Sequence, residues 1–135
     1  MSRIINNNGP GKERKLLTRA IVVAIRQLAR QNEIIHETKD LLSFIIMSLK
    51  SISESVERSV YAWEKRDYWL KADRFRLDWS WAGDCSKSLR TAYNNNDLVA
   101  ITKIIAEISQ KLNNVKVSNR NRIGTPWKGC SSLFD

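Results

Sequence analysis

The side chains in this chain that could act on a ligand are basic and aromatic, and they are concentrated between residues 60 and 93. This stretch holds four of the five tryptophans and seven of the 23 lysine and arginine residues. Lysine and arginine bind phosphate and release its counterions, while an indole ring can stack on an unpaired base. Because both types occur together, the stretch indicates nucleic-acid binding rather than catalysis.

The same stretch also has an explanation that needs no ligand. Its aromatic rings could form the core of a helical bundle, and its charges could form ion pairs on the surface. Arg74 and Asp78 stand four residues apart, which is the spacing of ordinary ion pairs along a helix. We favour a core role for Trp63 and Trp79, which fall on apolar seams, and a ligand contact for Trp69 and Trp81, which do not.

Two more segments carry an excess of positive charge. Between Arg3 and Gln31 the only acidic residue is Glu13, and the chain after residue 115 combines arginines with a Gly-Thr-Pro-Trp sequence that ends at Trp127. Trp127 could stack on a base as part of a clamp, or it could plug an apolar gap on the bundle, and the sequence leaves both open. The residues expected to contact nucleic acid are Arg14, Arg19, Arg26, Lys65, Arg66, Trp69, Arg74, Arg76, Arg120, Arg122 and Trp127.

Residues suited to catalysis or metal binding are few. There is one histidine, His36, and the two cysteines, Cys85 and Cys130, lack the spacing of a zinc site. Neither a dinucleotide-binding nor a P-loop glycine motif occurs. An enzyme would need a deep pocket that gathers Asp73, Asp84 or His36. We therefore predict a protein that is not an enzyme and that has no metal site and no cofactor.

Composition places the chain among single-domain globular proteins. It has 135 residues, of which 42% are hydrophobic and 27% charged, and its net charge is +9. The longest nearly apolar run, residues 41–49, is much shorter than the roughly 18 residues that cross a bilayer. The N-terminus lacks the apolar core of a signal peptide. These features predict a cytoplasmic protein with free thiols and no contact with a membrane.

The elements that carry these residues are predicted to be long helices. No glycine or proline lies between Gly11 and Gly83, and apolar residues recur at helical spacing. We predict helices over residues 12–31, 38–64, 67–93 and 97–113. Asp67 is expected to cap the third helix and Asp97 the fourth, while Gly83 is expected to kink or end the third.

The predicted fold is all-α, a bundle of four main helices. Residues 1–11 are expected to form an N-terminal arm, residues 12–114 the bundle, and residues 115–135 an irregular basic tail. Residues 37–64 form the only acidic segment, with three basic and five acidic residues, and are expected to face the rest of the bundle or another subunit.

In overall profile the chain resembles the small helical subunits of RNA-guided interference complexes, which line an RNA or DNA strand with basic helices. The resemblance concerns the fold alone and assigns no role to any residue. The leading hypothesis is a non-catalytic protein that binds the backbone of RNA or single-stranded DNA as one subunit of a larger assembly. The alternative is a structural or adaptor protein that docks on acidic protein partners or self-associates without nucleic acid.

Overall fold

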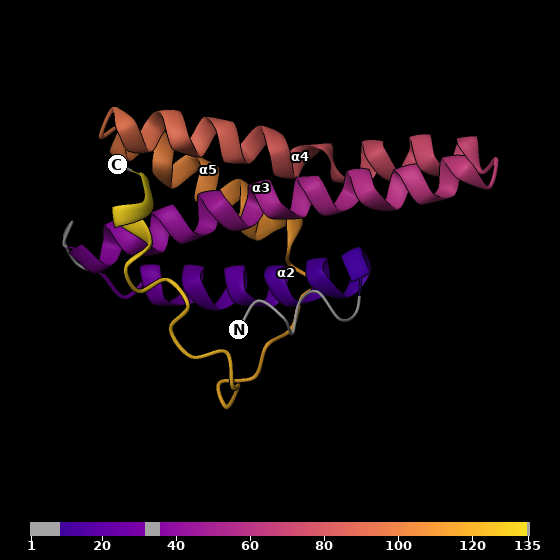
Figure 1. The fold of residues 1–135 in the computed structure, drawn as a ribbon. Helices are drawn as coiled ribbons and strands as arrows, with labels where there is room; N and C mark the ends of the chain where they lie inside the picture. The colour runs from indigo at the N-terminus through magenta and orange to yellow at the C-terminus, as the bar shows by residue number, and fades with distance from the viewer. Residues whose placement is uncertain (1–8, 32–35, 135) are drawn as a thin grey trace.

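A computed structural model describes residues 9–31 and 36–134, and within them it contains four α-helices and no strand (Figure 1). The prediction of an all-α fold with four main helices is confirmed. Most of the predicted arm, residues 1–11, lies outside the described residues. The helices are α2, Gly9–Leu28; α3, His36–Lys65; α4, Trp69–Asn94; and α5, Leu98–Lys111; a 3₁₀ helix, η1, spans Cys130–Phe134.

Helix α3 is the central element of the bundle. It forms a long antiparallel hairpin with α4 on one side and packs against α2 on the other, while α5 packs mainly on α4 (Figure 1). The predicted acidic segment therefore does face the rest of the bundle. Burial of apolar side chains is the main driving force for this arrangement. The fully buried large side chains of the main core are Ile21, Leu41, Ile45, Leu49, Ile52, Leu89 and Ile108.

The far end of the α3–α4 hairpin projects beyond α2 and α5 (Figure 1). We call residues 60–78 the hairpin tip. A second, smaller apolar cluster, built around Val56, Val60 and Ala72, joins the two helices there. The rings of Trp63 and Phe75 meet edge to face across it, 4.7 Å apart at their centroids. No helix in the described part of the chain has the length and apolar character needed to cross a membrane.

Helix α2 begins earlier than the sequence predicts. Pro10 and Gly11 lie in its first turn, although the Gly-Pro-Gly sequence was expected to precede the helix. Proline is tolerated in a first turn because its missing N–H would have no helical partner there. Gly9, at the start, has a positive φ of 75° that favours glycine.

Two turns of the same type end α3 and α4. Asp67 and Asn96 each adopt a left-handed backbone, with φ of 63° and 53°. The N–H of the next residue then bonds back to a carbonyl five residues earlier, from Tyr68 to Trp63 and from Asp97 to Ala92. This is the pattern of a Schellman motif, built here without glycine.

The two predicted N-caps had different outcomes. Asp97 caps α5 as expected, because its side chain accepts a hydrogen bond from the N–H of Ala100 at 3.1 Å. The expectation for Asp67 was wrong. Asp67 adopts the left-handed backbone of the preceding turn, so the N-cap of α4 is Tyr68. Tyr68 makes no side-chain capping bond.

Gly83 was expected to kink or end its helix, and the structure shows that it does not end it. Helix α4 continues through Gly83 to Asn94. A Cβ atom at Gly83 would lie 3.1 Å from Oγ of Ser53 on α3. The glycine therefore permits close packing of the two helices of the hairpin.

Candidate nucleic-acid interface

Helix α2 and the C-terminal tail together carry the strongest excess of positive charge in the molecule. Residues 9–31 hold six of the 23 lysine and arginine residues and one acid, Glu13, and residues 112–134 hold four and no acid. Glu13 forms an ion pair with Arg58 of α3. We call the surface formed by α2 and residues 112–134 the basic face.

A stripe of cations runs along α2. Its members are separated by three, four, seven and four residues, which places them on one side of a helix with 3.6 residues per turn. Within the described residues, none of them forms an ion pair with a carboxylate. Two of them, Arg19 and Arg26, were predicted to contact nucleic acid. The stripe consists of Lys12, Lys15, Arg19 and Arg26 on α2 and of Arg30 in the turn that follows it.

The tail is tied to α2 at its beginning by Arg26. The guanidinium of Arg26 donates to the carbonyl oxygen of Val117 at 2.9 Å and to Oδ1 of Asn119 at 3.3 Å. The tail passes α2 on its way to η1 (Figure 1). Arg26 was predicted to contact phosphate, and in the structure its guanidinium holds the tail in place.

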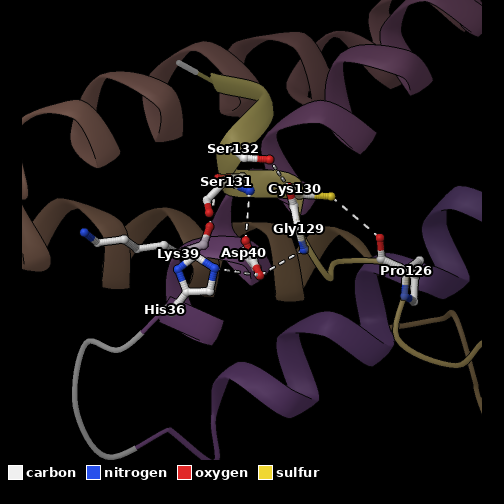
Figure 2. A network of polar contacts seen from close by, with 9 residues as sticks. His36, Lys39, Asp40, Pro126, Gly129, Cys130, Ser131 and Ser132 are labelled. Carbon is white, nitrogen blue, oxygen red and sulfur yellow. Dashed lines mark hydrogen bonds and ion pairs between the residues drawn. The ribbon is translucent and has the colours of Figure 1, made fainter.

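Asp40 holds the other end of the tail. Its carboxylate accepts hydrogen bonds from the backbone N–H of Gly129 at 3.0 Å and of Ser131 at 2.9 Å, and Nε2 of His36 lies 3.7 Å away (Figure 2). Burial acts to raise the pKa of Asp40, but the hydrogen bonds from Ser131 and Gly129 outweigh it and lower the pKa below its ordinary value. No local pattern in the sequence predicts this contact, because Gly129 lies 89 positions after Asp40.

Trp127 lies in the core beside this anchor. Its side chain is 3% exposed and meets the ring of Phe44 edge to face, 6.5 Å away at the centroids. Of the two alternatives, the plug on the bundle is the one that the structure shows. The prediction that Trp127 stacks on a base does not hold in this conformation, because its ring is covered by protein.

Between these two anchors the tail displays Arg120 and Arg122. Both side chains are exposed, and neither has a polar partner among the described residues. The loop that carries them is ordered by Asn121, whose side chain accepts from the N–H of Ile123 at 3.0 Å and donates to the carbonyl of Ser118 at 2.8 Å. Two predicted phosphate-binding residues are thus free to bind and are held on a structured loop.

Arg14 points away from the stripe, toward the hairpin. Its Nη1 donates to the carbonyl oxygen of Ser55 and to Oγ of Ser59, both at 3.0 Å, and its guanidinium lies 4.7 Å from the centroid of the Phe75 ring. Burial, followed by the nearby charge of Arg58, lowers the pKa of Arg14 from its ordinary value, although an arginine remains charged. Part of the predicted binding capacity of Arg14 therefore stabilises the fold.

The remaining predicted residues lie on the hairpin tip. Lys65, Arg66 and Arg74 are exposed, and Trp69 is 56% exposed. Nζ of Lys65 lies 5.0 Å from the centroid of the Tyr61 ring. Trp69 is therefore the predicted stacking residue that is open to a ligand.

Arg76 does not belong with these free cations. It pairs with Glu57 at 3.2 Å and approaches Glu64 and Asp73 at 3.8 Å. A hydrogen bond from Arg76 to Glu57, and the charge of Glu57, raise the pKa of Arg76. Three carboxylates surround this guanidinium, so a phosphate would have to compete with them.

One hollow lies at the hairpin tip and another lies between α2 and α4. One, of about 700 Å³, is lined at the tip by Trp69, Lys71, Arg74 and Asp78 among others. The other, of about 500 Å³, we call the α2–α4 hollow. Asp78 lines both, so the hollows lie next to each other along α4. The α2–α4 hollow is lined by Gly11, Arg14, Lys15, Thr18, Asp78, Trp79, Trp81, Lys111, Leu112 and Val115.

Lys15 lies four residues before Arg19 on the α2 stripe, and the basic spacing of this segment already marked it as a possible phosphate contact. Sequence reasoning did not select Lys111. Lys111 is brought to α2 only by the folding of α5 against the bundle, and no local pattern marks it.

The two thiols are free and buried. Burial, followed by the charge of Glu107, raises the pKa of Cys85 to about 11, and burial also raises the pKa of Cys130. Both are therefore protonated at neutral pH and are weak nucleophiles. In the ranges 9–31 and 36–134, no three His, Cys, Asp or Glu side chains gather in a way that could hold a metal ion.

Searches of protein-family models, curated proteins and solved structures each find no match to this chain.

Proposed function

We propose that this protein binds the phosphate backbone of RNA or single-stranded DNA through the basic face and acts without catalysis, as a subunit of a larger assembly. The observation that carries the proposal is the charge of this face. Nine of the 23 lysine and arginine residues lie on α2 and the tail, and the single acid there is paired with Arg58.

The way in which the tail is held supports this proposal. Arg26 and Asp40 anchor the tail at its two ends, so Arg120 and Arg122 are presented on an ordered loop next to the α2 stripe. Pre-ordered cations lose less conformational entropy on binding than cations on a disordered segment. The proposal also places the protein in the cytoplasm, where both thiols stay reduced.

A salt titration with a single-stranded oligonucleotide tests the proposal. When binding releases counterions, the logarithm of the binding constant falls linearly with the logarithm of the salt concentration. The slope is about −0.7 for each phosphate of a single strand that is neutralised. Replacing Arg120 and Arg122 by glutamine is expected to make the slope less steep by about 1.4. Lys87 and Lys103, which are exposed on α4 and α5, provide a control in which glutamine replaces the same number of charges.

Two results would contradict the proposal. One is an unmodified protein that fails to bind the oligonucleotide at about 50 mM salt. The other is an equal loss of affinity in the Arg120→Gln/Arg122→Gln and Lys87→Gln/Lys103→Gln variants, which would show that only the net charge matters.

A second candidate function is favoured by the hairpin tip. Five of the eight large apolar side chains that are most exposed in the described residues lie there: Tyr61, Tyr68, Trp69, Leu70 and Leu77. Such concentrations of apolar surface often mark protein contacts. A structural protein that self-associates through the tip, or docks it on an acidic partner, would explain them.

Light scattering without nucleic acid tests this second candidate. Self-association predicts an oligomer that dissociates in the Leu70→Ser/Leu77→Ser variant. It should persist when Leu133, an exposed leucine in η1, is replaced by serine. A protein that stays monomeric over the whole concentration range contradicts self-association.

A further inference from the structure

The α2–α4 hollow combines cations and aromatic rings in one concave site. Arg14 and Lys15 come from α2, Lys111 ends α5, and Trp79 and Trp81 come from α4. Three cations therefore face one acid, Asp78, across a space of about 500 Å³. The excess of positive charge suits an anionic ligand.

The two indoles form the aromatic wall of this hollow. The rings of Trp79 and Trp81 are stacked, with centroids 5.9 Å apart and planes inclined by 24°, and both side chains are only half-buried. The guanidinium of Arg14 lies 5.9 Å from the centroid of Trp79. Because Nη1 of Arg14 is held by Ser55 and Ser59, this edge of the hollow is already ordered.

We propose that the α2–α4 hollow receives one unpaired nucleobase of the bound strand, which stacks against the indole wall while its flanking phosphates meet Lys15 and Lys111. This inference rests on the proposed function and adds a base-binding site to it. A base inside a duplex is already paired and stacked, whereas a base of a single strand can turn outward onto an aromatic ring. The hollow therefore makes the protein prefer single strands to duplexes.

Gly11 provides a way to fill the hollow without changing any charge. It lines the hollow in the first turn of α2, and an added Cβ would meet only Nη2 of Arg14, at an ordinary contact distance of 3.8 Å. The variant Gly11→Leu places a larger side chain at the hollow, and Gly11→Ala is its matched control. Circular dichroism checks that both variants keep their helices.

The experiment measures the affinity of both variants for a single-stranded oligonucleotide and for the duplex of the same sequence, by fluorescence anisotropy. Stacking of one base contributes about 1–3 kcal/mol, so Gly11→Leu is expected to bind the single strand at least about fivefold more weakly than Gly11→Ala. Duplex binding should be equal in the two variants. A Trp81→Leu variant, which removes one ring of the wall, should show the same selective loss.

The outcomes separate this inference from the proposal on which it rests. If Gly11→Leu and Gly11→Ala bind the single strand equally, the hollow holds no base, although backbone binding stands. If the unmodified protein binds the duplex as tightly as the single strand, the base site is likewise overturned. If it binds neither, both the base site and the proposed function fail.

Discussion

The carboxylate of Asp40 accepts a hydrogen bond at 2.9 Å from the backbone N–H of Ser131, which lies 91 positions further along the chain. This bond joins the first turns of α3 to η1 and fixes the end of the tail (Figure 2). The edge-to-face contact of Trp127 with Phe44 lies beside it. A single buried carboxylate thus links the basic face to the core.

Replacing Asp40 by asparagine is expected to destabilise the protein in a pH-dependent way. Hydrogen bonds to a charged group contribute about 1.5–3 kcal/mol to stability. The free energy of unfolding of Asp40→Asn should therefore be lower than that of the wild type by roughly this amount at pH 7. The pKa of Asp40 is lowered in the folded state, so its contribution is fully present above the ordinary pKa of an aspartate. It is lost as the pH falls through the lowered value.

Urea unfolding of the wild type and of Asp40→Asn at pH 7 and at pH 3 checks this prediction. The difference in unfolding free energy should narrow at the lower pH. A difference that remains constant between the two pH values would show that the charge of Asp40 does not stabilise the tail.

Replacing Arg26 by glutamine is expected to loosen the beginning of the tail. The variant loses the bonds to Val117 and Asn119, and a loss of about 1.4 kcal/mol would open the loop roughly tenfold more often. Limited trypsin digestion, read by mass spectrometry, should show faster cleavage after Arg120 and Arg122. Arg19→Gln is the control, and equal cleavage in the two variants would contradict the anchoring role.

Asn96→Gly is expected to stabilise the protein by about 0.5–1 kcal/mol, because glycine adopts a left-handed backbone without steric cost. Asn96 has a φ of 53° in the turn that ends α4. Its neighbour Asn95 has a φ of −92°, so Asn95→Gly should bring no gain. Thermal unfolding compares the two variants. A higher melting temperature for Asn95→Gly than for Asn96→Gly would show that the left-handed backbone of Asn96 does not limit stability.

The effect of Gly83→Ala on stability is expected to depend on the side chain at position 53. Alanine raises helix propensity by about 0.5–1 kcal/mol, but its Cβ would lie 3.1 Å from Oγ of Ser53. In a Ser53→Ala background the nearest neighbour of the new methyl group is Cβ of residue 53, at an ordinary 3.7 Å. Gly83→Ala should then become stabilising. A double-mutant cycle measures this coupling, and simple additivity would show that the hairpin relaxes around the new methyl group.

The helices were predictable because their signals are local. Apolar residues such as Leu42, Ile45 and Leu49 repeat at helical spacing, and Asp97 stands where a capping oxygen reaches the first free N–H groups. Asp67 misled the prediction because aspartate can also adopt the left-handed turn that ends a helix. Gly83 misled it because glycine serves close helix packing as well as helix termination.

The sequence by itself determined an all-α fold and the segments that carry the excess of positive charge. Only the tertiary structure decided which cations stay available: Arg14, Arg26 and Arg76 find acceptors on other segments, while Arg120 and Arg122 do not. Likewise, Trp127 is buried and Trp69 is exposed. The physical reason is that helix formation depends on neighbours within about one turn, whereas the partner of a long side chain is set by residues up to 91 positions away.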